Sequence, residues 1–317
     1  MIKKIGVISM VFVLLIAIFS ITVTSVYAKG RIRISSGSLT GSWFPLGVVA
    51  GEIFTKAGFD YENTPGGAES NVIAIQEGIA DFGITMTSAI GMAMEGKGAY
   101  EYEMEDVVAL NFLHPDPFQV AITKKSGIES IEDFRGKTIA GAVPGQLSNF
   151  VMKEVFKAYG IDPDEDMEIV VGSQTEGMSL VRDGHADGWV QLTAPYNPRL
   201  TDLMYSIDMK LLPVSEECID KISNLNANRY IIEAGTYPGQ DEDVETFETP
   251  VVFAVNRNMP DETAYELIKA LVENIDIIQQ QSTILSLLTP SKMADMGNTP
   301  VHPGAIKYYK EIGVWNK

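Results

Sequence analysis

Along the chain, short apolar runs typical of strands alternate with stretches in which apolar residues recur with the period of a helix. The segments 31–34 and 137–140 are short apolar or alternating runs, and each precedes a glycine-containing loop and a helical stretch. In the first unit this helix is predicted at 45–56, with proline in its first turn, and Gly58 and Gly160 are placed to stop the two helices. The order strand, loop, helix, strand, helix, strand predicts a parallel α/β layout.

The chain contains an internal repeat. The sequence EGIADFGITMT at 77–87 has its counterpart in DGHADGWVQLT at 183–193, and a second helix is predicted before each copy, at 68–76 and at 176–182. Other matching pieces occur earlier in the same order, which chance explains poorly. The chain therefore repeats one α/β unit. Asp81 and Asp187, one in each copy, are interpreted as carboxylates that fix turns, since an anionic ligand would avoid them.

Two further apolar strands are predicted at 118–123, between the repeat units, and at 250–255, after the second unit. A chain that leaves one lobe by the first strand and returns by the second forms two lobes joined by two crossings, with a cleft and a hinge. We assign lobe one to 29–120 plus 252–317, and lobe two to 121–251. Helices predicted over about 261–282, and a later one ending near Tyr309, are expected to pack back on lobe one. The acidic stretch 241–248 is interpreted as a solvated loop.

The first 28 residues differ from the rest of the chain. Lys3 and Lys4 precede an apolar run over 5–23, and the segment closes with Val26, Tyr27 and Ala28. This pattern predicts a secretory signal peptide at 1–28, cleaved after Ala28, and a periplasmic protein. An uncleaved membrane anchor is the alternative, because a bilayer is spanned by about 20 apolar residues.

Composition and charge narrow the function classes. The chain has 317 residues, 45% of them hydrophobic, and a net charge of −18, which indicates a globular protein that would repel nucleic acids and anionic membrane surfaces. Cys218 is alone, so no internal disulfide is possible. Common catalytic motifs are missing, and the acidic run at 162–166 lacks the glycine of a calcium loop. We expect a monomeric binding protein without enzymatic activity, cofactor or metal.

The cleft is where ligand binding is expected. In each lobe the loop after the first strand ends at a helix N-terminus, where free N–H groups and the helix dipole favour an anion. The alternative is that the Ser, Thr and Asn side chains cap their helices, but two matching loops facing one cleft favour ligand binding. The candidates in these loops are Ser38, Thr40, Ser42, Trp43 and Phe44 in lobe one, and Gly145, Gln146, Leu147, Ser148 and Asn149 in lobe two.

The ends of the repeated strands supply further candidates. They are Thr85, Met86 and Thr87 in lobe one, and Gln191 and Thr193 at the corresponding positions of lobe two, with Asn197 in the loop that follows. Tyr237, in a loop flanked by Gly and Pro, is either a ligand contact or a surface turn residue. Trp43 is either a pocket residue or part of the core, and Trp189 is interpreted as packing.

Several of these segments resemble a known family. The sequence GSLTGSWFPLG at 37–47 resembles the opening motif of the TAXI family of TRAP-transporter solute receptors, and the similarity continues through TPGGAESN at 64–71, PGQLS at 144–148, GTYPG at 235–239 and HPGA at 302–305. The resemblance implies a type II-like periplasmic binding protein, with a mainly parallel sheet flanked by helices in each lobe and two crossing strands as hinge. It also implies delivery of a small organic acid to a sodium-driven TRAP membrane subunit.

The chain departs from the family pattern at three places. Trp43 and Phe44 replace paired tyrosines, Met86-Thr87-Ser88 replaces Gln-Ser-Asp, and Gln146-Leu147-Ser148 replaces Ser-Gly-Thr. If these positions contact the ligand, as the resemblance implies, the pocket is more apolar than one for glutamate or 2-oxoglutarate. We therefore expect a carboxylate with an apolar portion. An exported sensor that reports to a membrane signalling partner is the alternative function.

Overall fold

The computed structural model describes residues 29–39 and 41–315. The predicted signal peptide at 1–28 and the candidate Thr40 therefore lie outside the described residues. Within the described ranges, no helix is both long enough and apolar enough to cross a bilayer.

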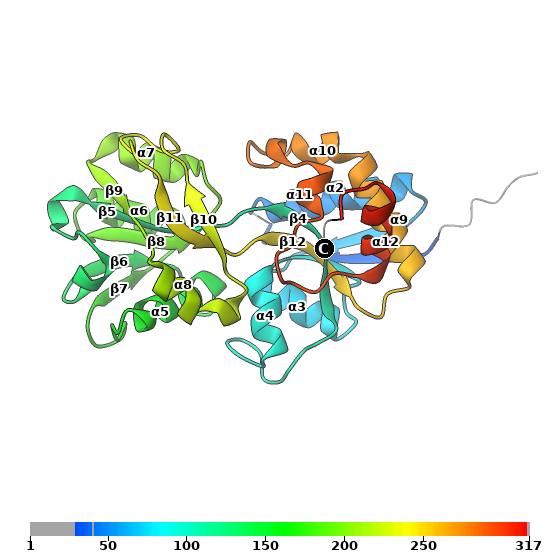
Figure 1. The fold of residues 1–317 in the computed structure, drawn as a ribbon, viewed down its shortest axis with the longest axis horizontal. Coiled ribbons are helices and arrows are strands. Elements are labelled where there is room, and N and C mark those ends of the chain that lie inside the picture. Colours follow the sequence, from blue (N-terminus) through cyan, green and yellow to red (C-terminus); the bar gives the residue numbers. More distant parts are fainter. Residues whose placement is uncertain (1–28, 40, 316–317) are drawn as a thin grey trace, which may run out of the picture.

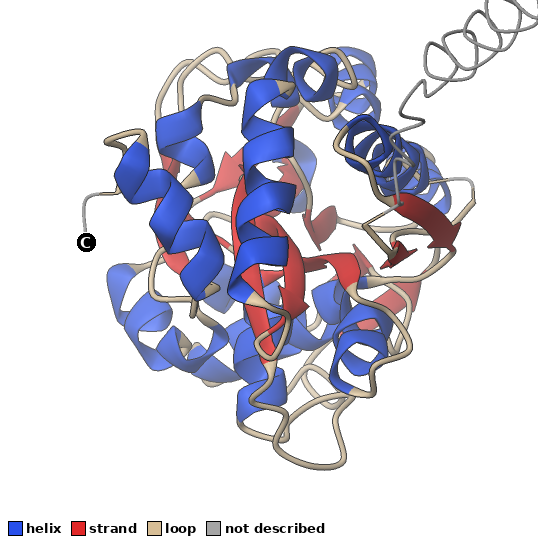
Figure 2. Ribbon diagram, turned by 90° about the vertical axis from the view of Figure 1, so that its right-hand side faces the viewer, coloured by secondary structure: helices blue, strands red, loops and turns tan. Residues whose placement is uncertain are grey.

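The first sheet has five strands in the order β2-β1-β3-β12-β4. β1, β2 and β3 are parallel, whereas β12 runs antiparallel to both of its neighbours. Helices lie on both sides of the strands (Figure 2). The strands are β1 (Arg31–Ser35), β2 (Asp60–Thr64), β3 (Phe82–Met86), β4 (Val107–His114) and β12 (Val251–Asn256), and the helices are α2 (Trp43–Lys56), α3 (Ala68–Gln76), α4 (Thr87–Met94), α9 (Asp261–Glu273), α10 (Ile275–Gln279), α11 (Pro290–Met293) and α12 (Pro303–Glu311).

The second sheet repeats this arrangement, with strand order β7-β6-β8-β5-β9 (Figure 1). Beside it lies a two-stranded antiparallel ribbon of β10 (Asn228–Ile232) and β11 (Val244–Glu248). The remaining elements of this lobe are the strands β5 (Phe118–Thr123), β6 (Thr138–Gly141), β7 (Glu168–Val171), β8 (Gly188–Leu192) and β9 (Met209–Leu212), the α-helices α5 (Leu147–Ala158), α6 (Gln174–Arg182), α7 (Pro198–Ser206) and α8 (Glu216–Lys221), and the 3₁₀ helices η1 (Lys124–Ser126), η2 (Ile131–Phe134) and η3 (Ser223–Leu225). The predicted α/β fold of two lobes is confirmed.

The internal repeat reappears in the hydrogen bonds that close each unit. The Asp81 carboxylate accepts from the Arg33 N–H at 2.9 Å, and the Asp81 N–H donates to the Arg33 C=O at 2.8 Å. In lobe two, Asp187 makes the same pair of contacts with Thr138, at 3.0 and 2.7 Å. Each aspartate thus fixes the turn before the third strand to the first strand, as predicted from the sequence.

Glycine ends the first helix of each unit in the same way. Gly58 has φ +96° and Gly160 has φ +73°, which is the left-handed region that glycine adopts without strain. Because of this turn, the Phe59 N–H donates to the Phe54 C=O at 3.0 Å, and the Ile161 N–H donates to the Phe156 C=O at 3.0 Å. Both helix ends are therefore closed by the same motif.

One sequence-based assignment of local structure was wrong, and the bounds of two predicted helical stretches differ. The stretch 241–248 is not a solvated loop, because 244–248 form β11, in which Phe247 is fully buried and stacks on Phe118 at 5.2 Å between ring centroids. Only the start of the acidic stretch is loop. The helices predicted over about 261–282 are α9 and α10, which meet at Asn274 and end at Gln279. Helix α2 begins before Pro45, which its first turn still tolerates.

Two chain segments connect the sheets. Residues 115–117 lead from β4 to β5, and residues 249–250 lead from β11 to β12. The Thr249 N–H donates to the Asp116 C=O at 3.2 Å, and Pro117 pairs with Glu248 in an antiparallel bridge. We call 115–117 and 249–250 the crossing segments. They lie side by side, and β5 belongs wholly to the second sheet, whereas β12 belongs to the first.

Candidate functional site

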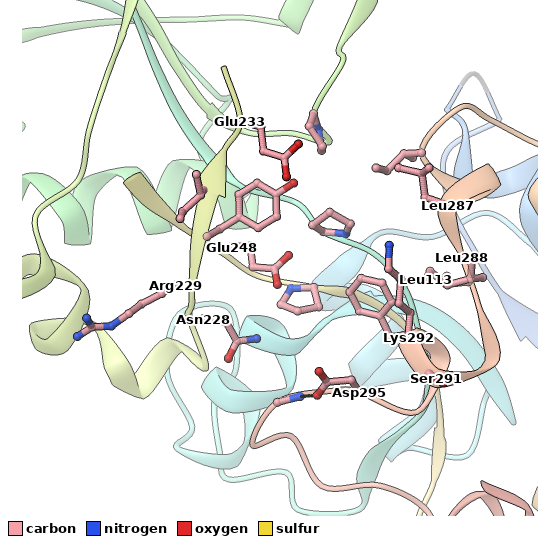
Figure 3. Close-up of a pocket in the computed structure, with 18 of the residues that line it drawn as sticks. Leu113, Asn228, Arg229, Glu233, Glu248, Leu287, Leu288, Ser291, Lys292 and Asp295 are labelled. Atoms are coloured by element: carbon pink, nitrogen blue, oxygen red, sulfur yellow. Dashed lines mark hydrogen bonds between the residues drawn. The ribbon is translucent and has the colours of Figure 1, made fainter. Parts of the chain in front are cut away.

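A cavity of about 950 Å³ lies where the two lobes meet (Figure 3). Lobe two contributes β10 and the turn at Tyr196, and lobe one contributes the segment from Ile284 to α11. The crossing segments contribute Pro115 and Pro250, with Glu248 directly before the second of them. The cavity is therefore bounded by both lobes and by the chain that joins them.

Apolar and aromatic side chains form much of the wall. Leu287 is half exposed, at 50%, on the lobe-one side, and Ile231 is 51% exposed on the lobe-two side. Tyr196, which has φ +60°, and Tyr230 add aromatic surface. Exposed apolar residues on both walls of one cavity are suited to contact a ligand or to meet one another when the lobes approach.

The charged residues of the cavity are mostly acidic. Glu233, Glu248 and Asp295 line it together with Arg229 and Lys292. The Arg229 guanidinium is held by Glu216 and by Asp220, and it points away from the cavity (Figure 3). Lys292 reaches in from α11, opposite the two glutamates (Figure 3).

Glu248 has an unusual environment. Its Oε2 atom is buried and, among the described residues, accepts no hydrogen bond. Burial, and next the negative charge of Asp295, raise the pKa of Glu248 to about 7. Burial and the charge of Glu248 likewise raise the pKa of the neighbouring Asp116 to about 8. Two carboxyl groups whose pKa values are raised to near neutral pH thus lie at or next to the crossing segments.

None of the predicted site residues that the structure describes lines this cavity. Ser38 and Ser42 are exposed in the loop after β1, and Trp43 and Phe44 are partly buried at the start of α2. Trp43 packs against the lobe-one core. Ser42 occupies the N-cap position of α2, but its side chain makes no cap hydrogen bond. The loop is therefore near the crossing side of lobe one without entering the cavity.

The residue that positions this loop, Asn71, was not among the predicted site residues. Asn71 is fully buried, and its amide donates to the Ser36 C=O and to the Ile84 C=O, both at 2.6 Å. Its oxygen accepts from the Ser35 hydroxyl at 2.6 Å and from the Gly67 N–H at 3.2 Å. All four hydrogen-bonding positions of this side chain are used. Asn71 thereby ties the ends of β1 and β3 to the loop before α3.

The end of β3 holds two hydroxyl groups without partners. Thr87 and Ser88, the first residues of α4, are fully buried, and neither hydroxyl makes a hydrogen bond with the described residues. The Thr87 N–H donates to the C=O of Pro250, which lines the cavity, at 2.9 Å. Of the other candidates here, Thr85 donates its hydroxyl to the Ala68 C=O at 2.8 Å, and Met86 is buried.

Across the junction of the lobes, Asn226 of lobe two covers this helix start. Asn226 follows η3, and its side-chain amide donates to the Thr87 C=O at 3.3 Å. Helix α4 and η3 are in contact. The unpaired hydroxyls of Thr87 and Ser88 are therefore buried at an interlobe contact, directly behind the cavity wall.

In lobe two, the predicted loop is held by backbone contacts. Gly145, with φ +84°, and Gln146 are exposed, whereas Leu147 is buried. Asn149 donates its amide to the Ala142 C=O at 2.9 Å. The Ser148 hydroxyl does not cap α5, as one interpretation had it; it accepts from the Leu192 N–H at 2.9 Å and so fixes α5 to the end of β8.

The other lobe-two candidates surround the start of α7. Asn197 caps this helix by accepting from the Arg199 and Leu200 N–H groups, and its amide donates to the Thr193 hydroxyl at 2.8 Å. The Tyr237 hydroxyl accepts from the Asn197 N–H at 3.4 Å. Tyr237 is not a surface turn residue but a buried one, and burial raises its pKa to about 12. Gln191 is buried on β8, as is Trp189.

The cavity residues had little signal in the sequence. Glu248 is the last residue of the acidic stretch 241–248, which was interpreted as a loop because of its charge. Lys292 follows Thr289 and Pro290, which form an ordinary helix start. Glu248 and Lys292 meet at the cavity because the chain returns from lobe two to lobe one through 249–250. The alternation of Val244, Thr246 and Glu248 on one face of a strand was the available clue.

We expect Thr87→Val to leave the melting temperature of the ligand-free protein unchanged or slightly higher. An unpaired buried hydroxyl contributes no hydrogen bond, and valine has the same shape. Thr85→Val is the matched control, because its hydroxyl is bonded to Ala68, and it should cost about 1 kcal/mol of stability. Chemical denaturation of both variants measures this difference. Equal destabilisation by the two substitutions would show that the Thr87 hydroxyl is bonded in solution.

The fold is that of a two-lobed solute-binding protein. The chain is similar to XAC2383 from Xanthomonas citri, at 12% identity and a TM-score of 0.55 over 89% of this chain and 95% of that one. It is also similar to the periplasmic sulfonate-binding protein SsuA from Methylobacillus flagellatus, at 15% identity and a TM-score of 0.50 over 90% and 88% of the two chains. An L-cystine ABC transporter protein from Listeria monocytogenes matches at 12% identity and a TM-score of 0.47 over 81% and 97%.

The family follows from the sequence itself. The model of the NMT1-like family matches residues 34–313, which is most of the chain. The protein therefore belongs to the NMT1-like family. The match runs through both lobes and both crossing segments, so it describes the whole two-lobed body and not one lobe alone.

Proposed function

We propose that this protein is an exported receptor that captures a small organic anion between its lobes and delivers it to a TRAP-type membrane carrier. In this proposal residues 1–28 direct export and are removed after Ala28. The chain crosses between the lobes at 115–117 and 249–250, so the predicted boundary at 120 falls inside β5, which belongs to lobe two. The carrier type rests on the resemblance to TAXI receptors at 37–47 and 64–71.

The observation that carries the proposal is the cavity at the crossing segments. Its walls come from both lobes, so a ligand in it would contact both and would favour their closed arrangement. The SsuA protein of similar fold is named for sulfonate binding, which is also capture of an organic anion.

Lys292 supplies a positive charge for the anion, because its side chain points into the cavity (Figure 3). The apolar wall at Leu287, Ile231 and the tyrosines would take the apolar portion of the ligand.

A thermal-shift screen of mono- and dicarboxylates, followed by calorimetry, tests this proposal. We expect at least one acid to stabilise the protein in a concentration-dependent way without being consumed. Lys292→Ala should weaken its binding about tenfold or more, because a charge-assisted hydrogen bond is lost, whereas Lys269→Ala on the outer surface should not. Turnover of the acid, or stabilisation by no acid in the panel, would contradict the proposal.

Closure of the lobes gives a further test. Small-angle scattering should show a smaller radius of gyration when the protein is saturated with an acid that calorimetry has confirmed. The exposed walls at Leu287 and Ile231 would then approach each other. An unchanged radius at saturation would argue against closure on the ligand.

A further inference from the structure

The cavity indicates a second chemical feature of the ligand. We propose that the ligand carries a protonated nitrogen, as an ammonium or guanidinium group, and that Glu248 binds it beside the crossing segments. This inference rests on the proposed function, because it concerns the same cavity and the same ligand.

The first support is the state of the Glu248 carboxylate. Its Oε2 atom is buried and accepts no hydrogen bond from any described residue, yet the side chain lines the cavity. A buried carboxylate oxygen without a partner is unfavourable, and a cationic nitrogen donor would supply both a hydrogen bond and a compensating charge.

The second support is the charge balance of the cavity. Glu233, Glu248 and Asp295 face it, whereas the Arg229 charge is already taken by two carboxylates outside it. Lys292 then remains as the cation on the wall (Figure 3). Above about pH 7, where Glu248 is ionised, a ligand with acid groups alone would match Lys292 but would meet an excess of negative charge. A ligand with both an acid and a protonated nitrogen matches both sides.

The third support is the surrounding surface. Tyr230 and Phe112 line the cavity with Glu248, and aromatic faces attract cations. The ionisable groups around Glu248 come from several elements: Asp116 from the first crossing segment, Tyr230 from β10, Lys292 from α11 and Asp295 from the loop after it. Burial and Asp295 raise the pKa of Glu248, and a bound cation would lower it again.

Matched ligand pairs test the inference. We would titrate the full protein calorimetrically at pH 8 with 3-phenylpropanoate and phenylalanine, with pentanoate and 5-aminopentanoate, and with glutarate and glutamate. Within each pair the second member adds only the protonated nitrogen. We expect the nitrogen-bearing member of at least one pair to bind about ten- to hundredfold more tightly than its partner.

Variants then assign the effect to Glu248. Glu248→Gln should remove most of that preference while leaving the affinity for the plain acid equal or higher. Glu245→Gln is the matched control, since Glu245 is exposed on the same strand and does not line the cavity. It should leave the preference unchanged.

The outcomes separate this inference from the proposed function. Plain acids that bind as tightly as their nitrogen-bearing partners would overturn the role of Glu248 and leave the anion receptor standing. A nitrogen preference that survives in Glu248→Gln would also overturn it. Failure of every member of every pair to bind at millimolar concentration would overturn both proposals.

Discussion

Asn71→Asp is expected to destabilise the protein by roughly 3–5 kcal/mol. The substitution keeps the size of the side chain but replaces the amide that donates to the Ser36 and Ile84 carbonyls with an oxygen that repels them. Because the side chain is fully buried, water cannot compensate the loss. The ends of β1 and β3 should separate, and ligand binding should be lost with them. Urea denaturation followed by circular dichroism measures the change.

Asn149→Asp provides the comparison in lobe two. Asn149 is also buried, but its amide makes one hydrogen bond, to the Ala142 C=O. Its replacement should cost about 1–2 kcal/mol. A loss below about 1 kcal/mol for Asn71→Asp, or equal losses for the two variants, would show that the Asn71 network does not hold the strand ends together.

The second large effect concerns pH. Between about pH 6.5 and 9 we expect the ligand-free protein to lose roughly 2 kcal/mol of stability. The pKa values of Glu248 and Asp116 are raised to about 7 and about 8 in the folded protein, so the folded state binds protons that the unfolded state has already released. Stability therefore falls as pH rises through these values.

The histidines oppose this trend only at the acidic edge of the window. Burial lowers the pKa values of His114 and His302 below the ordinary value of about 6.5, so above about pH 7.5 both side chains are neutral in the folded and the unfolded chain and add nothing to the dependence. Melting curves of wild type, Asp116→Asn and Glu248→Gln between pH 6.5 and 9 test the prediction. The two variants should flatten the dependence, and Glu245→Gln should not. A wild-type melting temperature that rises with pH over this range would refute it.

The repeat made the fold predictable from the sequence. Gly58 and Gly160, and Asp81 and Asp187, mark the same points of two α/β units, and each makes the same local contact in the structure. Such contacts join residues close in sequence or strands within one unit, so local patterns are enough to place them. Strand 118–123 was placed correctly for the same reason, since it is a short run of mostly apolar residues.

The site was less predictable, because its residues are far apart in the sequence and meet only when the chain has crossed back from lobe two to lobe one. Glu248, Lys292 and Tyr230 come from three elements that have no shared motif. Ser148 shows the limit of local reasoning: its position at a helix start indicated a ligand contact or a cap, but its hydroxyl accepts from the Leu192 N–H on β8, 44 residues away in the sequence. For Thr87 and the two glycine loops, a ligand contact stays a prediction.

The paired crossing segments have a mechanical consequence for any partner. Because 115–117 and 249–250 are joined by backbone contacts, they form a narrow ribbon that bends easily but resists sliding of one strand along the other. If the lobes close on a ligand as proposed, occupancy of the cavity changes the angle between the two lobes. A partner that contacts one lobe alone would meet the same surface in the ligand-free and the ligand-bound protein. Only a partner that contacts both lobes at once can distinguish the ligand-free protein from the ligand-bound one.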